Sequence, residues 1–304
     1  MRFLTPKLTI LLSAIICTFC IGCEQVEEVK YQEVSKVPLS GDVELEVEED
    51  KNKNLYIELD TTDWEEVEVV GVKSCKYSAK DGIIQIEYHN DSLEDVIIDV
   101  KKDGVNKEYK YLLNNGPQRK DIITLTEGTG DYRIRFLKKK NSTSYTLLHQ
   151  FYIKMEEDTN TKYLVSTQQV PFEDSKHLQM LKDTLKSQQF TFKKSAVNYA
   201  TGMVKYDTKK AEEVSGQTMF NYKLDIDETI ENQKGICIDK SVLLASILRS
   251  EGIPTKVIHG YRGDEWHSWV EIYNDEKAQW QLIDPSIVLN AKRPNLEYNK
   301  YYTF

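Results

Sequence analysis

The chain has 304 residues, of which 40 are Lys or Arg and 49 are Asp or Glu, so its formal net charge at pH 7 is -9. Hydrophobic residues make up 40% and charged residues 29%, which is ordinary for a soluble globular protein. This composition excludes a chain that is disordered throughout and a polytopic membrane protein. The acidic balance argues against a protein built to hold nucleic acid. The length suits one large domain or two of moderate size.

The first segment has the pattern of an export signal. Arg2 and Lys7 precede a run of uncharged and mostly apolar residues, 8–23, that ends before Glu24. A membrane-spanning helix needs about 20 apolar residues, so this run is short for one. A basic start followed by a short apolar run is typical of a secretory signal peptide. We therefore predict that residues 1–22 are a signal peptide and that the protein is exported.

The apolar run ends in a small residue directly before a cysteine, in Cys20-Ile21-Gly22-Cys23. This ending resembles the lipobox of bacterial lipoproteins, although Cys20 stands where that motif usually has leucine. The resemblance implies that Cys23 is acylated and becomes the mature N-terminus. Its lipid would hold the protein on the extracellular face of the cell membrane without a spanning helix. The alternatives are a simple secretory signal with chance cysteines and an uncleaved anchor.

The use of cysteine agrees with export. Of the five cysteines, Cys17 and Cys20 would leave with the signal and Cys23 would carry the lipid. The remaining two, Cys75 and Cys237, are too few for a disulfide-stapled domain. Either they pair across distant parts of the chain or both stay free, and we expect the second. We predict that Cys75 is a small hydrophobic residue of a core.

Much of the acidity is concentrated near the start of the mature chain. Residues 24–50 hold ten acidic residues against two lysines, which is a charge of -8. Without the signal the chain carries about -11, so only about -3 belongs to residues 51–304. We interpret residues 23–40 as a solvated acidic tether that lifts the folded part off the membrane. The acidity therefore says little about the substrate.

Residues 41–155 contain a series of short alternating or apolar runs separated by turn residues. The runs are 43–47, 55–59, 67–70, 83–88, 96–100, 108–113, 122–125, 132–137 and 144–153. Many short strands at this spacing predict a β-sandwich. Gly130-Asp131-Tyr132 leads into an alternating strand and resembles the late strands of immunoglobulin-like bacterial modules. We therefore predict an N-terminal all-β, immunoglobulin-like sandwich domain, a resemblance that implies no chemistry.

Beyond Tyr163 the apolar spacing changes from that of strands to that of helices. Residues 173–186 and 191–204 have helical spacing, whereas 207–226 are polar and predicted to be a surface loop. This change places a domain boundary near residues 156–170. We predict a second domain, of mixed helices and strands, over residues 165–304.

A further helix is predicted over residues 238–251. It stops at Gly252, with Pro254 just beyond, as helices commonly do. Cys237 falls at its N-terminus, where unsatisfied N–H groups and the helix dipole favour a thiolate, the nucleophilic form of cysteine. The alternative is that Cys237 is only a buried residue of a core helix, the usual fate of a lone cysteine. Its position alone does not decide between the two.

Two alternating runs on either side of the polar residues 274–277 predict a β-hairpin. If Tyr273 pairs with Ala278, His267 faces Asp284 at the open end of the hairpin. A carboxylate beside an imidazole fixes its tautomer and lets the histidine serve as base to a nucleophile. A bulge would shift this register.

Three motifs follow one another from residue 233 onward. They are Gly235-x-Cys237-x-Asp239 at the start of a helix, Trp266-His267-x-Trp269-Val270-Glu271-Ile272, and Trp280-x-Leu282-x-Asp284-Pro285. Together they are similar to the transglutaminase-like superfamily of papain-type cysteine enzymes, over about residues 190–290. The resemblance implies an α+β, papain-type domain. In it Cys237 is the nucleophile, His267 the general base and acid, and Asp284 the residue that orients His267.

The resemblance also implies roles for neighbouring residues. Trp266 and Trp269 are expected to flank the site and to bind substrate. The backbone N–H of Cys237 is the best candidate for the oxyanion donor, and Gln233 or Tyr206 are further candidates. The chain departs from the family at Lys240, where an aromatic residue is common, and at Ser268, where alanine is more usual. Neither departure removes a catalytic group.

The implied reaction is acyl transfer. The thiolate attacks an amide carbonyl, His267 protonates the leaving amine, and a thioester remains on Cys237. Water as the acceptor gives peptide or amide hydrolysis, and a lysine amine gives a protein cross-link; the sequence leaves both open. No cofactor is expected. No metal is expected either, because Cys237, His259 and His267 lack the spacing of zinc ligands.

The expected substrate is a protein or peptide at the cell surface or in the cell wall, and no nucleic-acid partner is expected. Two other functions stay open. The transglutaminase-like domain could be a catalytically idle binding or scaffold module presented by the β-sandwich. The β-sandwich could also be the functional part and bind a partner or a glycan.

Overall fold

A computed structural model describes residues 46–48, 56–58, 61–69, 72–91, 95–141, 144–214, 222–287 and 297–304. These residues all belong to one compact unit. The predicted signal peptide, the lipidation site Cys23 and the tether over residues 23–40 lie outside the described residues. Among the described residues, no helix has both the length and the hydropathy needed to cross a membrane.

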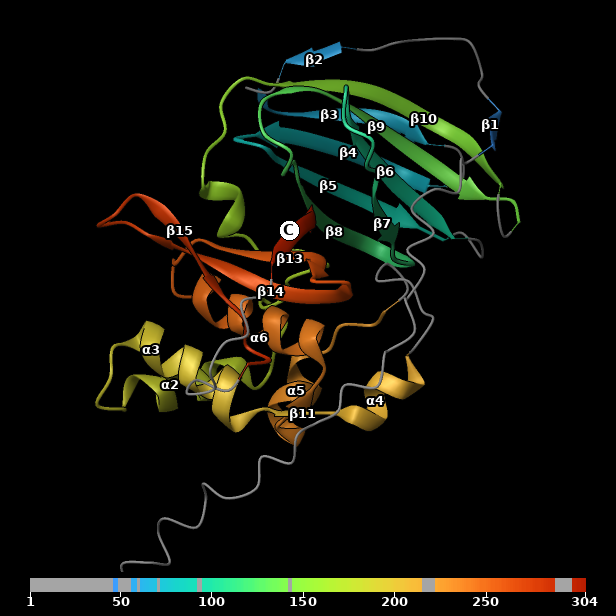
Figure 1. The fold of residues 1–304 in the computed structure, drawn as a ribbon. Helices are drawn as coiled ribbons and strands as arrows, with labels where there is room; N and C mark the ends of the chain where they lie inside the picture. Colours follow the sequence, from blue (N-terminus) through green and yellow to red (C-terminus); the bar gives the residue numbers. More distant parts are fainter. Residues whose placement is uncertain are drawn as a thin grey trace, which may run out of the picture. The chain divides into compact units, whose positions relative to one another are not determined.

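Two β-sheets build the N-terminal β region, residues 46–155 (Figure 1). One sheet has the order β3 (Thr61–Val69), β4 (Val72–Lys80), β5 (Ile83–Asn90) and β8 (Gly116–Thr124). The other has the order β1 (Glu46–Glu48), β10 (Ser144–Met155), β9 (Gly130–Lys139), β6 (Val96–Lys102) and β7 (Tyr109–Leu113), with β2 (Tyr56–Glu58) also on β10. Neighbouring strands are antiparallel except β1 and β2, which run parallel to β10.

The alternating runs bury one face of each sheet. In β5, every second side chain from Ile84 to Asn90 is buried, and those between are half-exposed. Tyr77 of β4 stacks on Phe151 of β10 with ring centroids 4.3 Å apart, so the two sheets meet across a shared core. The likeness to immunoglobulin-like modules stays a prediction.

Strand β4 has no counterpart among the runs that predicted strands. Only every second residue of this strand is apolar near its middle, at Cys75, Tyr77 and Ala79, and lysines and serines separate them. These three side chains are buried. Burial raises the pKa of the Cys75 thiol to about 12, which fits its predicted role as a small core residue. Cys75 and Cys237 are both free, as predicted.

The second part of the chain combines one sheet with a layer of helices. The sheet has the order β15 (Gln279–Ile283), β14 (Glu265–Asn274), β13 (Thr255–Arg262) and β16 (Tyr298–Thr303), all antiparallel. Helix α6 (Cys237–Arg249) packs on β13 and β14, and every residue from Ile238 to Arg249 is buried. A helix that is buried on every side occupies a core position.

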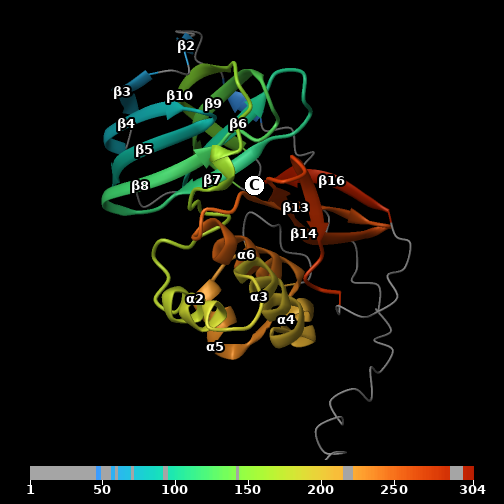
Figure 2. The same cartoon turned by 90° about the vertical axis from the view of Figure 1, so that its left-hand side faces the viewer.

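Three shorter helices complete this layer (Figure 2). They are α2 (Leu178–Lys186), α3 (Phe192–Asn198), which continues into the π-helical turn η3 (Tyr199–Met203), and α5 (Ile226–Asn232). Helices α3 and α5 pack on α6, and α2 packs on α3 and α5. This part of the structure has the mixed helix and strand content that the sequence predicts for the second domain. The predicted helix over 173–186 is shorter than expected, because α2 begins only at Leu178.

The predicted loop over residues 207–226 contains one helix and the start of another. Helix α4 (Thr208–Glu213) begins where the Asp207 side chain accepts a hydrogen bond from the N–H of Lys210. In the same way, the Asp225 side chain caps α5 by accepting from the N–H of Glu228. Aspartate is a favoured N-cap residue. These two caps could have indicated the two helices, but the polar composition of the stretch favoured a loop.

Strand β16 also contacts the N-terminal β region. The Thr126 hydroxyl donates to the carbonyl oxygen of Thr303 over 2.7 Å, and the N–H of Thr303 donates to the Tyr109 hydroxyl over 3.3 Å. The Tyr109 ring meets the rings of Tyr302 and Phe304 edge-on, at 5.1 and 5.4 Å between centroids. The sheet of the second part is therefore joined to the N-terminal β region through its last strand, β16.

Candidate active site

The tight turn between β13 and β14 fixes the position of His267. Gly263 has a φ of +60° in this turn, so Arg262 and Glu265 are directly paired across the hairpin. Two residues further along β14, His267 pairs with Gly260 and is only 3% exposed. The imidazole is thus carried by a hydrogen-bonded strand rather than by a loop.

Cys237 is the first residue of α6. The Asp239 carboxylate caps this helix by accepting the N–H of Ile236 over 2.9 Å. Gly235 lies so close to Asp239 that a Cβ added at Gly235 would be 2.7 Å from the Asp239 Cβ, which only glycine avoids. The thiol therefore stands at the end of a 13-residue helix whose first-turn N–H groups point away from the helix body.

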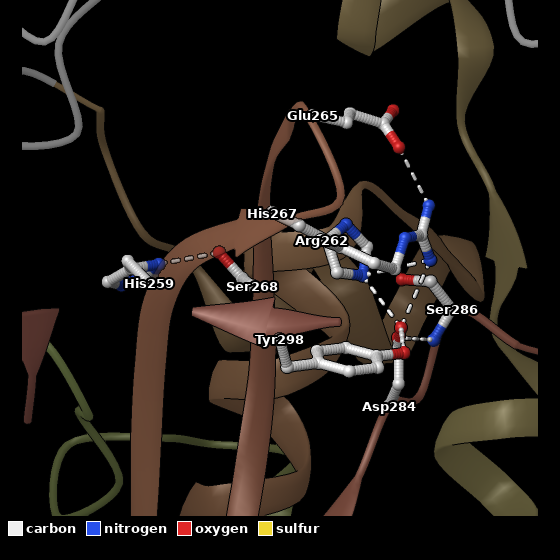
Figure 3. Close-up of polar contacts among 8 residues, drawn as sticks. All are labelled: His259, Arg262, Glu265, His267, Ser268, Asp284, Ser286 and Tyr298. Carbon is white, nitrogen blue, oxygen red and sulfur yellow. Dashed lines mark hydrogen bonds and ion pairs between the residues drawn. The ribbon is translucent and has the colours of Figure 1, made fainter. Parts of the chain in front are cut away.

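The structure brings the three predicted catalytic residues together. The His267 Nε2 lies 2.8 Å from the Asp284 Oδ2 (Figure 3). Burial lowers the pKa of His267, but hydrogen bonds to Asp284 and to the Cys237 side chain, together with the negative charges of both, outweigh burial and raise that pKa to about 9. His267 is therefore held as an imidazolium between a carboxylate and the cysteine.

Asp284 is an ionised carboxylate. Burial raises its pKa, but the hydrogen bond and charge of His267, the N–H of Ser286 and the charge of Arg262 outweigh burial and lower it to about 2. Because a carboxylate only accepts, the His267 Nε2 must be the donor in their contact. The Nδ1 is then the ring nitrogen that remains for Cys237.

The predicted register of the second hairpin is wrong by two residues. The structure pairs Tyr273 with Trp280, not with Ala278. Ala278 has a φ of +48° and stays in the loop, so the loop is 275–278 instead of 274–277 and every pair of the hairpin shifts. Since the shift is even, each side chain keeps its predicted face. Asp284 follows the end of β15 and turns back toward His267 while its Oδ1 accepts the N–H of Ser286 over 2.9 Å.

Four residues that the sequence analysis did not single out also belong to the site. The Asp284 Oδ2 accepts from the Arg262 Nη1 over 3.0 Å and from the Tyr298 hydroxyl over 2.9 Å. Glu265 holds the far side of Arg262, with 2.8 Å between Oε2 and Nη2. The turn sequence from Arg262 to Glu265 was a usable signal for an ion pair. Tyr298 and Ser286 gave none, because their contacts depend on how the chain returns after β15.

The two tryptophans lie on opposite sides of β14. Trp269 is fully buried and its ring is 5.1 Å from that of Tyr298, so it packs beneath the site. Its role in substrate binding stays a prediction. Trp266 is on the face opposite His267, against the rings of Tyr261 and Tyr301 at 5.2 and 6.0 Å. A substrate-binding role for Trp266 stays a prediction.

Lys240 is a buried ammonium one turn after Cys237. It is 3% exposed, and burial lowers its pKa to about 8 although the charge of Asp284 opposes this. The family commonly has an aromatic residue here, so the substitution adds positive charge near Asp284 instead of a ring.

His259 lies on the other face of the same sheet. Its Nδ1 is 2.5 Å from the Ser268 hydroxyl, and its ring meets that of Phe304 at 5.5 Å. Burial, and then the charge of His267, lower the pKa of His259 to about 3, so it is neutral. These contacts give His259 a structural environment. In the described part of the chain, no three or more His, Cys, Asp or Glu side chains are arranged to hold a metal ion.

Comparison with known proteins identifies a family for the region that holds the site. Residues 181–285 match the family model described as the transglutaminase-like superfamily. A comparison with curated proteins gave no match.

Solved structures give distant likenesses. A candidate cysteine protease from Cytophaga hutchinsonii is 14% identical with a TM-score of 0.38, and the match covers 72% of this chain and 71% of that one. Red sea bream transglutaminase is 12% identical with a TM-score of 0.31, over 70% of this chain and 49% of that one. A candidate protease from Parabacteroides distasonis is 15% identical with a TM-score of 0.29, over 61% and 37%. The match thus spans about half of the transglutaminase and less of the third protein.

Proposed function

Because residues 181–285 are a transglutaminase-like domain, we propose that the protein is a cysteine enzyme that takes an acyl group from an amide onto Cys237. One observation carries the proposal. His267 contacts both Cys237 and the ionised Asp284 in a buried position, and its pKa is raised to about 9. An imidazolium held beside a cysteine is the arrangement that a thiolate nucleophile needs.

The first half of the reaction forms a thioester. The Cys237 sulfur attacks the amide carbonyl carbon, a C–S bond forms, and the tetrahedral oxyanion develops near the N-terminus of α6. The C–N bond then breaks as the imidazolium of His267 gives its proton to the leaving nitrogen, which departs as an amine. Asp284 keeps the ring oriented throughout and balances the positive charge of the imidazolium.

The second half releases the acyl group. Neutral His267 takes a proton from the acceptor, whose oxygen or nitrogen attacks the thioester carbonyl, and the C–S bond breaks to restore the thiolate. Water as the acceptor yields a carboxylic acid, and a lysine amine yields a cross-link. We propose that hydrolysis of a peptide or amide is the main outcome and protein cross-linking a possible second one.

We further propose that the enzyme works outside the cell on protein or peptide at the surface or in the wall. The support is the sequence of its start: an apolar run after Arg2 and Lys7, closed by Gly22-Cys23. Lipid on Cys23 would anchor the protein to the membrane. If so, Cys23→Ala leaves the exported protein in the aqueous phase of a detergent partition, whereas the unaltered protein enters the detergent phase. Equal partition of the two would remove the anchor from the proposal.

Thiol labelling tests the catalytic proposal without knowledge of the substrate. At pH 7, iodoacetamide should modify Cys237 faster than an ordinary thiol, and His267→Ala should slow this labelling by about tenfold or more. Cys75 is the internal control, since it is buried and its pKa is about 12. Equal labelling rates for the two proteins would contradict the mechanism.

Turnover separates an enzyme from an idle scaffold. A library of peptides, with and without added amines, should give products with the unaltered protein and none with Cys237→Ala. If Cys237 labels rapidly and yet the two proteins give the same products, the binding-module alternative is favoured.

A further inference from the structure

The catalytic carboxylate is shared between two cations. On the Asp284 Oδ2 converge the His267 Nε2 at 2.8 Å, the Arg262 Nη1 at 3.0 Å and the Tyr298 hydroxyl at 2.9 Å (Figure 3). The Oδ1 accepts the N–H of Ser286. The oxygen that orients the histidine is thus also the oxygen that pairs with an arginine, so neither cation has it alone.

Arg262 and His267 face each other as two donors. The Arg262 Nη1 lies 3.2 Å from the His267 Nε2. A guanidinium has no acceptor, and the Nε2 must carry a proton to donate to Asp284, so this contact is not a hydrogen bond. When His267 is an imidazolium, two positive charges lie side by side in a buried site, where charges are screened weakly.

Arg262 is fixed in this place from both sides. It is 6% exposed and, besides Asp284, it pairs with Glu265, its direct partner across the two-residue turn. The positive φ of Gly263, which glycine adopts without strain, allows that turn to be short. A side chain buried and held by two carboxylates cannot swing away when His267 gains its proton, so its charge acts on His267 throughout the reaction.

We propose that Arg262 is a positioning residue that shares the Asp284 carboxylate with His267 and thereby keeps the imidazolium acidic enough to protonate the leaving amine. This inference rests on the proposed function. The stronger the hold of Asp284 and Cys237 on the imidazolium proton, the less readily that proton reaches a leaving group. Arg262 weakens that hold without removing the carboxylate.

The other charged groups around His267 do not replace Arg262. The cysteine and Lys240 come from α6, Asp284 follows β15, Glu265 shares β14, Tyr298 comes from β16 and His259 from β13. Among these, Cys237 and Asp284 raise the pKa of His267, and His259 is neutral. Lys240 comes from the helix side, where its charge interacts with that of Asp284. Arg262 is the cation in contact with the ring.

The test is a titration of His267 by NMR, in the full-length protein with labelled histidine. The chain has five histidines, and the His267 signal is identified by its loss in His267→Ala. Arg262→Met keeps the length of the side chain but removes its charge, and it should raise the pKa of His267 by about one unit. The upper inflection in the pH profile of Cys237 alkylation should rise with it.

Glu265→Gln is the matched variant, and it should shift the pKa of His267 in the opposite direction. It leaves Arg262 in place but removes the carboxylate that balances its outer side, so the pKa of His267 should fall by less than a unit. Arg262→Lys keeps a positive charge at this position, so the pKa of His267 in this variant should be close to that in the unaltered protein. A pKa of His267 that is unchanged or lowered in Arg262→Met, or raised in Glu265→Gln, would overturn the inference. Should Arg262→Met not fold, the direction of the pKa shift in Glu265→Gln still decides.

These outcomes differ from a failure of the proposed function. If the unaltered protein lacks rapid labelling of Cys237, the cysteine mechanism fails whatever the titration shows. If Cys237 is labelled rapidly and the pKa of His267 is unchanged in Arg262→Met, the cysteine mechanism stands and only the proposed role of Arg262 is wrong.

Discussion

His259 and His267 lie on opposite faces of one sheet. Comparison of the two shows how burial and neighbouring charges together set the pKa of a histidine. They are 2% and 3% exposed, so burial alone would treat them alike. His259 meets a serine hydroxyl and the Phe304 ring, and its pKa is lowered to about 3. His267 meets Asp284 and Cys237, and its pKa is raised to about 9. In this protein a buried imidazole stays neutral unless a carboxylate and a cysteine are placed against it.

The largest expected effect comes from removing the carboxylate that distinguishes the two histidines. Asp284→Asn leaves the shape of the site but should let the pKa of His267 fall below its ordinary value, as for His259. An amide can also hold the wrong tautomer, so turnover should fall by about 10³-fold or more. NMR titration and product formation measure the two effects. A variant that keeps the raised pKa would show that Cys237 alone charges His267.

The stability of the protein should depend on the two histidines in opposite pH ranges. The folded state holds a proton on His267 more tightly than the unfolded state, so its contribution is complete below about pH 6.5 and is lost as the pH rises toward 9. The folded state resists a proton on His259, so stability rises with pH between about 3 and 6.5. Each effect should amount to a few kcal/mol.

Chemical denaturation at several pH values checks this contrast. His267→Gln should flatten the fall in the free energy of unfolding between pH 6.5 and 9, and His259→Gln should flatten the rise between pH 3 and 6.5. The difference between variant and unaltered protein is the quantity to compare, because other groups titrate in the same ranges. If both variants change the same pH range, the contrast between the two faces is wrong.

A smaller effect is expected from Lys240, the cation on the helix side of the site. Its pKa is about 8 in the folded protein against 10.5 as an ordinary lysine, so below pH 8 the folded state carries an unfavourable buried charge. Lys240→Met should therefore raise the free energy of unfolding at pH 7 by about 2 to 3 kcal/mol, and the gain should shrink toward pH 10.5. Lys209→Met, at an exposed lysine paired with Glu213, is the control and should change little. A loss of stability in Lys240→Met would mean that the lysine has a partner that offsets its burial.

Local patterns predicted much of the fold. Alternation identified most strands of the N-terminal β region, and helix formers followed by Gly252 identified α6 to within two residues. The pattern failed where polar residues carry the structure. In β4 lysines lie between buried residues, and α4 and α5 begin at aspartate caps inside a polar stretch.

Sequence motifs predicted the central residues of the candidate site. Three separated motifs indicated Cys237, His267 and Asp284, and the structure brings these side chains into contact. The register behind that prediction was wrong, because the left-handed conformation of Ala278 has no signal in an alternating pattern. Tyr298 was missed for a different reason: it reaches Asp284 only because β16 pairs with β13, and pairing between distant segments is not written in local spacing.

Because of strand β16, the second half of the protein is not expected to fold well without the N-terminal β region. At one end Tyr298 donates to the Asp284 carboxylate, and at the other Thr303, Tyr302 and Phe304 contact Tyr109 and its neighbours in the N-terminal β region. A gene fragment that starts at the domain boundary would leave buried Tyr302 and Phe304 facing water on the strand that also supports the active site. Exchange of the N-terminal region between relatives would therefore have to bring a matching surface for these two rings, so the two halves are expected to evolve as a pair.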